Sequence, residues 1–132
     1  MIYLLDTNVL IERSRSNPHP KVRQWFGKLM ASQIVLCPVV VAEFMIGVFK
    51  KPPGKRHAEI RFLRECRRFF GWADVDMKSA VAFGKLRAGL KIRIGHNDLW
   101  LGAIASANGL KVATRNEHDF KVQKVDFENP WR

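Results

Sequence analysis

The chain has 132 residues, and its 23 Lys and Arg outnumber 12 Asp and Glu, which gives a formal net charge of +11. A hydrophobic content of 47%, with nine Phe and four Trp, is enough for one folded core and excludes an intrinsically disordered chain. We expect a single domain over residues 1–132. The longest apolar run, residues 34–42, is about half of the roughly 18 residues that a membrane-spanning helix needs. We therefore expect a soluble, cytoplasmic protein with no membrane partner.

Two cysteines, Cys37 and Cys66, are far apart in the chain, and neither belongs to a Cys-x-x-Cys motif or a Cys/His cluster. This spacing argues against a disulfide framework and against a structural zinc site. The sequence predicts two buried free thiols.

The first third of the chain alternates short apolar runs with helical patterns. Residues 2–5 predict a buried strand, and the Asp-Thr-Asn triplet at 6–8 predicts that a helix begins directly after it, because all three side chains favour helix N-caps. A second helix is expected after Pro18. Residues 34–37 are typical of another buried strand, and a proline then opens a third helix over about 38–50.

A Lys-Pro-Pro-Gly break at residues 51–54 precedes a strongly basic helical pattern over 55–70. On a helical wheel, one face of this segment is apolar and another is basic. The basic face consists of His57, Arg61, Arg64 and Arg68.

The second half of the chain continues the alternation. Asp76 is the expected N-cap of a helix that runs to about residue 90, and Gly109 is expected to end a helix at 97–108. The remaining expected elements are a helical turn at 116–120 and strands at 72–75, 110–114 and 122–127. Strands that alternate with helices predict an α/β fold in three layers, with a mostly parallel central sheet of four to five strands flanked by helices.

Several of the twelve acids stand in apolar sequence rather than beside Lys or Arg. Asp6 ends an apolar strand, Glu43 lies within Val-Val-Val-Ala-Glu-Phe-Met-Ile, and Asp98 lies within Asn-Asp-Leu-Trp-Leu. An ionised carboxylate in such surroundings is unfavourable unless it is paired, protonated or bound to a metal. Because the carboxyl ends of parallel strands converge at one edge of the sheet, these acids and Asp119 could point into one crevice.

Each acid also has a structural explanation. Asp6 could be only an N-cap, Asp98 only a favourable charge in a first helical turn, and Asp119 an ordinary loop acid. Glu43 could pair with a distant Arg. Four such acids together favour a shared site over four separate explanations.

The order and spacing of four segments resemble the PIN-domain ribonucleases, most closely the VapC-type toxins of type II toxin–antitoxin modules. The segments are Leu-Leu-Asp-Thr-Asn-Val-Leu, Val-Ala-Glu-Phe-Met-Ile-Gly, Asn-Asp-Leu-Trp-Leu-Gly-Ala-Ile-Ala and Ala-Thr-Arg-Asn-Glu-His-Asp-Phe, which together span nearly the whole chain. The resemblance implies a PIN-like fold and a toxin that cleaves RNA. It implies an acidic quartet with two supporting polar residues near the metal: Asp6, Glu43, Asp98 and Asp119, with Thr114 and Asn116.

Oxygen ligands without clustered Cys or His select a hard cation, so Mg²⁺ or Mn²⁺ is the expected cofactor. We assign Asp6 and Asp98 as the principal ligands and Asp119 as a ligand at a second or water-mediated metal position. Glu43 is assigned as a ligand or as the residue that orients the attacking water. Carboxylate-bound metals can activate a nucleophile and neutralise the charge that develops on a phosphodiester. The family resemblance implies products with 5′-phosphate and 3′-hydroxyl ends.

The charge of +11 favours a nucleic-acid partner, because neutralised phosphates release counterions. A charged helix face is often simply solvated, but here the whole chain is biased toward positive charge. The candidate RNA-binding residues are Arg61, Arg64 and Arg68 on the basic helix and Arg87 and Arg93 shortly before Asp98.

The main alternative is a non-catalytic basic nucleic-acid-binding module whose acids are structural. The sequence has no Gly-x-x-x-x-Gly-Lys-Ser/Thr motif of a P-loop nucleotidase. A haloacid-dehalogenase-type phosphatase would need a second acid where this chain has Asn8. The resemblance also implies a cognate antitoxin protein and a homodimer. The apolar helix at 39–49 could lie at the dimer interface or be buried within the monomer.

Overall fold

The computed structural model describes all 132 residues, and its five strands form one sheet in the order β3-β2-β1-β4-β5 with every pair parallel. The strands are β1 (Tyr3–Leu5), β2 (Ile34–Leu36), β3 (Gly71–Trp72), β4 (Lys111–Ala113) and β5 (Phe127–Glu128). The α helices are α1 (Thr7–Ser14), α2 (Pro20–Gly27), α3 (Pro38–Phe49), α4 (His57–Phe69), α5 (Met77–Gly89), α6 (His96–Asn108) and α7 (Glu117–Val122). Two short 3₁₀ helices are η1 (Ala31–Gln33) and η2 (Pro53–Lys55).

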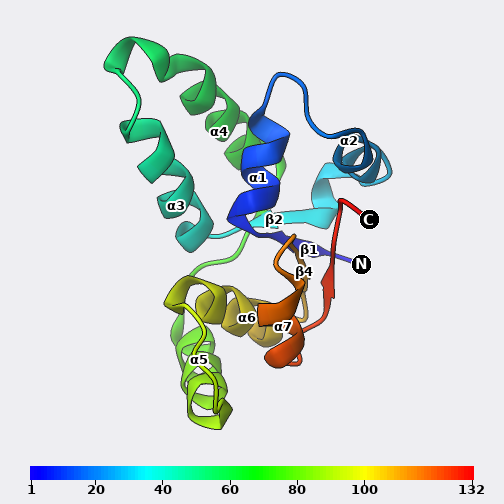
Figure 1. Ribbon diagram of the computed structural model, residues 1–132, viewed down its shortest axis with the longest axis vertical. Helices are drawn as coiled ribbons and strands as arrows, with labels where there is room; N and C mark the ends of the chain where they lie inside the picture. The colour runs from blue at the N-terminus through cyan, green and yellow to red at the C-terminus, as the bar shows by residue number, and fades with distance from the viewer.

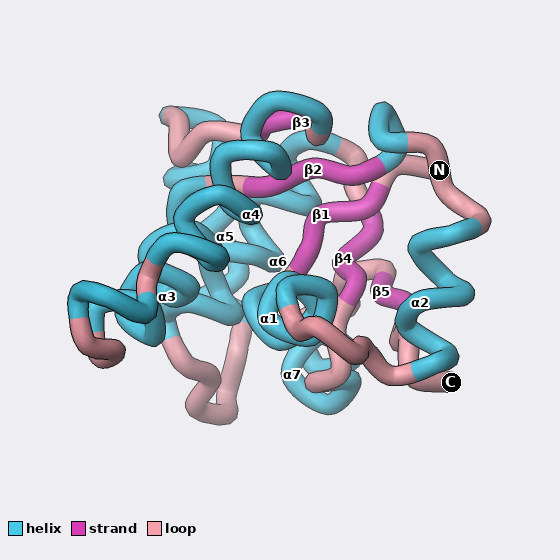
Figure 2. Tube along the Cα trace, turned by 90° about the horizontal axis from the view of Figure 1, so that it is seen from above, coloured by secondary structure: helices cyan, strands magenta, loops and turns pink.

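The chain winds outward from β1 in two directions. It first adds β2 and β3 on one side of β1, and it then returns to add β4 and β5 on the other side. Because parallel crossovers are right-handed, the two halves place their helices on opposite faces of the sheet. Figure 1 shows α1 to α4 above the strands and α5 to α7 below them, and Figure 2 shows the strands side by side in sheet order. The winding direction reverses between β1 and β4, which is where open α/β sheets bind ligands.

The predicted three-layer α/β fold is confirmed. The central strand β1 is buried along its whole length because helices cover both faces of the sheet. A core of 22 buried residues includes Cys37 and Cys66, which are both free thiols as predicted. Burial raises the pKa of each thiol to about 11, so both remain neutral. None of the helices has the length and apolar content that a membrane span requires.

The strand predicted at 72–75 is wrong in extent, because β3 pairs with β2 only at residues 71 and 72. The Trp72 indole N–H donates to the Asp74 carboxylate (2.5 Å), and Val75 is exposed. The chain therefore leaves the sheet two residues after β3 begins and runs toward Asp76, which caps α5 as predicted.

The strand predicted at 122–127 is also wrong over most of its length. Gln123 and Val125 are buried while Lys124 is exposed, so burial alternates as in a strand although the segment is a turn. Lys124 has a left-handed φ of 57°, which a strand does not allow. Only residues 127 and 128 pair with β4.

The helix predictions at 38–50 and 97–108 are confirmed to within one or two residues. Gly109, with a φ of 64°, ends α6 in the left-handed conformation that glycine permits. The basic helix begins at His57 rather than at residue 55, because the segment that begins at Pro53 forms the short helix η2 instead.

One face of α3 is part of the core of the monomer. Val40, Phe44 and Val48, which are spaced four residues apart, are buried, whereas Ile46 and Phe49 are exposed. Burial within the monomer therefore accounts for one face of this apolar helix, and the other face remains at the surface.

Candidate active site

The site lies at the carboxyl edge of the sheet, between β1 and β4. Asp6 directly follows β1, and its backbone N–H donates to the carbonyl of Ala113 at the end of β4 (2.9 Å). The Asp6 carboxylate caps α1 by accepting from the backbone N–H of Thr7 (2.7 Å). Thr114 follows β4 at the same level, so its hydroxyl reaches Asp6 and donates to Oδ2 (2.7 Å).

Glu43 reaches this edge from α3, where it lies half-buried in the second turn. The hydroxyl of Thr7 donates to Glu43 Oε1 (2.8 Å), while the backbone N–H of Thr7 binds Asp6. One threonine therefore connects two of the predicted acids, which are 37 positions apart in the chain.

A second set of hydrogen bonds leads from Thr114 to Asp98. The Thr114 hydroxyl accepts from the backbone N–H of Asn116 (2.9 Å), and the Asn116 side chain donates to Asp98 Oδ2 (2.8 Å). The carboxyl groups of Asp98 and Asp119 are within hydrogen-bonding contact of each other. All four predicted acids and both supporting residues are thus brought into one connected group.

Burial and the closeness of these acids to one another change their pKa values. Burial, the contact with Asp119 and the charge of Asp6 raise the pKa of Asp98 to about 7. The pKa of Asp119 is lowered because it accepts a hydrogen bond from Asp98. Burial and the charge of Glu43 raise the pKa of Asp6, although hydrogen bonds from Thr114 and Thr7 act against them.

No Lys or Arg neutralises this group of acids. Asp6, Glu43 and Asp98 form no ion pair with a basic side chain, and the basic side chain in contact with Asp119 is His118, with Nδ1 at 3.2 Å. An excess of negative charge is therefore concentrated at one edge of a protein whose net charge is +11.

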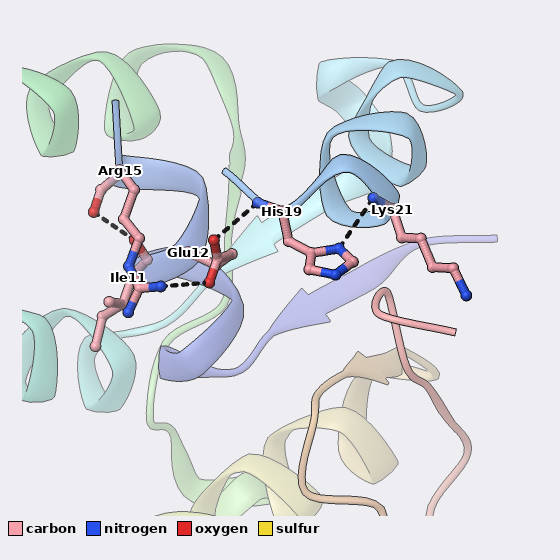
Figure 3. A network of polar contacts seen from close by, with 6 residues as sticks. Ile11, Glu12, Arg15, His19 and Lys21 are labelled. Carbon is pink, nitrogen blue, oxygen red and sulfur yellow. Dashed lines mark hydrogen bonds and ion pairs between the residues drawn. The ribbon is translucent and has the colours of Figure 1, made fainter. Parts of the chain in front are cut away.

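Glu12 shows how the same fold accommodates a structural acid. Its buried carboxylate accepts from Arg15 Nη1 (2.9 Å) and from the backbone N–H of His19 (3.0 Å), as Figure 3 shows. The contact with Arg15 lies at the end of α1, and the contact with His19 joins α1 to the start of α2, where His19 is the N-cap and Nδ1 accepts from Lys21 N (3.2 Å). Asp6 is buried to the same degree but has no such cation.

The donor set suits a hard divalent cation. It consists of carboxylate oxygens that lack a basic counterion, and such oxygens are the ligands that Mg²⁺ and Mn²⁺ prefer. No three acidic, imidazole or thiol side chains surround a common point as a ready-made metal site. The carboxylates are instead held by Thr7, Thr114 and Asn116 and, for Asp98 and Asp119, by each other.

Two residues of the site make contacts that the sequence does not predict. The sequence predicts Thr7 and Asn8 as residues that favour a helix N-cap; in the structure the Thr7 hydroxyl also binds Glu43, and Asn8 binds Asp6 through Nδ2 (3.2 Å). Asn8 Oδ1 also accepts from the backbone N–H of Arg115 (3.2 Å). Their position directly after Asp6 is the available signal for the contact between Asn8 and Asp6, but Glu43 and Arg115 lie far away in the chain.

The candidate RNA-binding arginines have different environments. Arg61, Arg64 and Arg68 are exposed on α4, and Arg93 is exposed before α6. Arg87 is half-buried, and its Nη2 donates to the carbonyls of residues 90 (3.3 Å) and 92 (3.2 Å). Arg87 therefore also holds the connection between α5 and α6.

Comparison with known proteins identifies relatives over nearly the whole chain. A family model described as "PIN domain" matches residues 3–126. "Plasmid stability protein StbB" of Pseudomonas syringae pv. tomato is 33% identical, covering 97% of this chain and 97% of the relative. "VapC ribonuclease Y4jK" of Sinorhizobium fredii is 30% identical, covering 97% and 96%. "Toxin FitB" of Neisseria gonorrhoeae is 30% identical, covering 97% of each.

A similar arrangement of elements is found in a solved structure. "Crystal Structure of FitAcB from Neisseria gonorrhoeae" matches with a TM-score of 0.89 and 29% identity, covering 99% of each chain. The five parallel strands and their helices are therefore an arrangement that is already known from experiment.

Proposed function

Because the chain belongs to the PIN-domain family, we propose that it is an endoribonuclease that acts as the toxin of a toxin–antitoxin pair. The proposal is supported by relatives named as a VapC ribonuclease and as a toxin, each matched over nearly its full length. The observation that carries it is the group of four acids that are linked through hydrogen bonds near the β1–β4 edge and form no ion pair with Lys or Arg. Its site of action would be the cytoplasm, where cellular RNA is present.

The proposed cofactor is Mg²⁺ or Mn²⁺. Asp6 and Asp98 would hold the cation, with Asp119 as a further or water-mediated ligand. When bound, the cation supplies charge neutralisation for the scissile phosphate and a more acidic water. Glu43, fixed by the Thr7 hydroxyl, would hold the cation or orient the attacking water.

The supporting residues of the site orient the acids. The Thr114 hydroxyl and the Asn8 amide fix the Asp6 carboxylate, and the Asn116 amide fixes Asp98. Such contacts limit the rotation of each carboxylate, so that less conformational entropy is lost when a ligand binds.

The proposal is tested by incubating the purified chain with RNA in Mg²⁺ or Mn²⁺ and, separately, in EDTA. We expect cleavage in the metal buffers only, with 5′-phosphate and 3′-hydroxyl ends on the fragments. RNA that is bound but left intact in both metals would instead support the non-catalytic binding module. The chain is purified under conditions that remove bound protein, so that an inhibitor does not mask activity.

The proposed protein partners are a cognate antitoxin and a second copy of the chain. An acidic antitoxin segment would complement the net charge of +11. The exposed face of α3, with Ile46 57% and Phe49 61% exposed, is available for the homodimer. Co-expression with the protein encoded beside this gene is expected to suppress cleavage, and unchanged cleavage in its presence would argue against that partner.

The basic face of α4 is proposed to contact RNA phosphates. Replacing Arg61, Arg64 and Arg68 with Gln is expected to weaken RNA binding at low salt and to reduce the slope of log affinity against log salt by about 2, since each phosphate contact to single-stranded RNA contributes about 0.7. Filter binding over a salt series measures the slope. A control with Lys21, Lys28 and Lys124 changed to Gln removes the same charge elsewhere. Equal slopes for the two variants would show that RNA binding depends on the net charge of the chain and not on the position of the arginines on α4.

The raised pKa of Asp98 predicts how pH affects stability. Folded Asp98 keeps its proton up to about pH 7, whereas the carboxyl of the unfolded chain ionises near the ordinary value of 3.8. Between these values the unfolded state binds fewer protons than the folded state. The free energy of unfolding of the metal-free protein should therefore fall as pH rises toward 7.

A cation must displace this proton, so Mg²⁺ should raise the melting temperature more at about pH 8 than at about pH 5. Thermal melts with and without Mg²⁺ across this range measure both effects. Asp98→Asn is expected to flatten the metal-free dependence between pH 4 and 7, since Asn does not titrate. A Mg²⁺-induced shift of the same size at both pH values would contradict the assignment of Asp98 as a ligand.

A further inference from the structure

A buried glutamine beside the acids has an unusual environment. Gln123, the first residue after α7, is 5% exposed, and its Nε2 donates to the backbone carbonyl of Asp98 (3.2 Å). Its Oε1 is buried and has no hydrogen-bond partner. A buried, unpaired amide oxygen is unfavourable, so an apolar side chain of similar shape would serve stability at least as well. The amide group therefore calls for an explanation other than stability.

Gln123 connects the two helices that carry a pair of the acids. Asp98 lies in the first turn of α6, and Asp119 lies in α7. The side chain of Gln123 binds the carbonyl of Asp98, while its backbone N–H donates to the carbonyl of Asp119 (3.4 Å). One residue thus contacts the main chain of both acids, whose carboxyl groups contact each other.

The room for this amide is provided by Gly102, which follows Asp98 by about one turn of α6. A Cβ atom at position 102 would lie 1.9 Å from Gln123 Oε1 and 2.9 Å from its Cδ. Any larger residue would displace the amide from its place against α6. The Gln123 amide therefore occupies space that only a glycine at position 102 leaves free.

We propose that Gln123, seated against Gly102, is a positioning residue that holds Asp98 and Asp119 at the separation required to bind a divalent cation. This inference rests on the proposed function, since it concerns the same acids. The neutral amide suits the position because it donates to the Asp98 carbonyl without adding another negative charge beside the carboxylates.

The test compares cation binding with stability in Gln123→Met. Met fills a similar volume but donates no hydrogen bond, so the melting temperature should be unchanged or raised. The affinity for Mn²⁺, measured by calorimetry on the whole chain without RNA, should fall about tenfold or more, as when other residues that orient metal ligands are replaced. RNA cleavage should need a correspondingly higher Mn²⁺ concentration and recover at saturation.

Gln33→Met is the control. Gln33 Nε2 donates to the backbone carbonyl of Met1 (3.2 Å) and Oε1 accepts from the backbone N–H of Met30 (2.9 Å), so this variant also removes amide-to-backbone hydrogen bonds, but just before β2 and away from the acids. Its Mn²⁺ affinity should equal that of the wild type. Equal affinities of Gln123→Met and the wild type would overturn the inference.

The Gly102→Ala variant is a second test of the role of Gln123. The added Cβ should expel the amide, which lowers both the melting temperature and the Mn²⁺ affinity. In Gly102→Ala/Gln123→Ala the space is restored, so the melting temperature should recover toward the wild type while the Mn²⁺ affinity stays low. Recovery of both would indicate a purely structural role and overturn the inference.

The two proposals fail in distinguishable ways. A wild-type chain that binds Mn²⁺ but leaves RNA intact contradicts the proposed ribonuclease, while the binding data still decide the role of Gln123. A wild-type chain that does not bind Mn²⁺ overturns both. Loss of Mn²⁺ affinity in Gln123→Met, without loss in Gln33→Met, supports the inference.

Discussion

Replacing Asp98 with Asn is expected to lower the rate of RNA cleavage by at least about 1000-fold, because losing several kcal/mol of transition-state stabilisation from the cation has an effect of this size. Asn keeps the shape of the side chain but carries no negative charge to hold a metal. RNA binding should persist, since the basic surface is unchanged and one negative charge is removed. Single-turnover cleavage rates and filter-binding affinities, measured on the same preparation, test both expectations.

The matched control is Asp126→Asn. Asp126 is exposed and forms no ion pair, so this variant makes the same change of charge away from the site. It should cleave RNA at the wild-type rate. Cleavage by Asp98→Asn within about tenfold of the wild type would contradict the metal-ligand role, because about 1.4 kcal/mol is too small a loss for a principal ligand.

Replacing Phe120 with Ala is expected to lower the free energy of unfolding by about 3–5 kcal/mol, as for other fully buried phenylalanines. Phe120 is 0% exposed and is the buried anchor of α7, the helix that carries Asp119. Loss of the ring leaves a cavity and removes the packing that fixes this helix. Urea denaturation should show a lower midpoint with an unchanged slope, which indicates a loss of stability without a change in the unfolding reaction.

Phe69→Ala is the control, because it makes the same Phe-to-Ala change at an exposed position. Phe69 is 59% exposed at the end of α4, so its removal should change the free energy of unfolding by no more than about 0.5 kcal/mol. A loss below about 1 kcal/mol for Phe120→Ala would mean that α7 is not packed against the core as described.

The local signals of the sequence were sufficient for the fold class, and they indicated three acids with apolar neighbours. A short apolar run followed by Asp-Thr-Asn predicts a strand and then a capped helix, and Asp6 is indeed the N-cap of α1. Pro38 and Gly109 marked one helix start and one helix end correctly. Asp6, Glu43 and Asp98 stood out because a carboxylate among apolar neighbours is costly without a partner.

The tertiary structure alone decided how those acids are arranged. Thr114 reaches Asp6 across 108 positions because β1 and β4 are neighbours, a pairing that is set by the order of strands and not by adjacency in the chain. The raised pKa of Asp98 likewise depends on burial and on Asp119 and Asp6, which come from other elements.

The errors in the sequence predictions also arise from packing between elements that are far apart in the chain. Residues 122–127 alternate in burial as a strand does, because the turn after α7 packs Gln123 and Val125 against the rest of the molecule. The close contact between Gln123 and Gly102 could not be predicted from the sequence either, since neither residue has a local pattern that indicates the other. The sequence by itself determined which segments bury apolar side chains and which acids need a partner. Their partners were decided by packing between elements far apart in the chain, because short-range periodicity contains no information about those contacts.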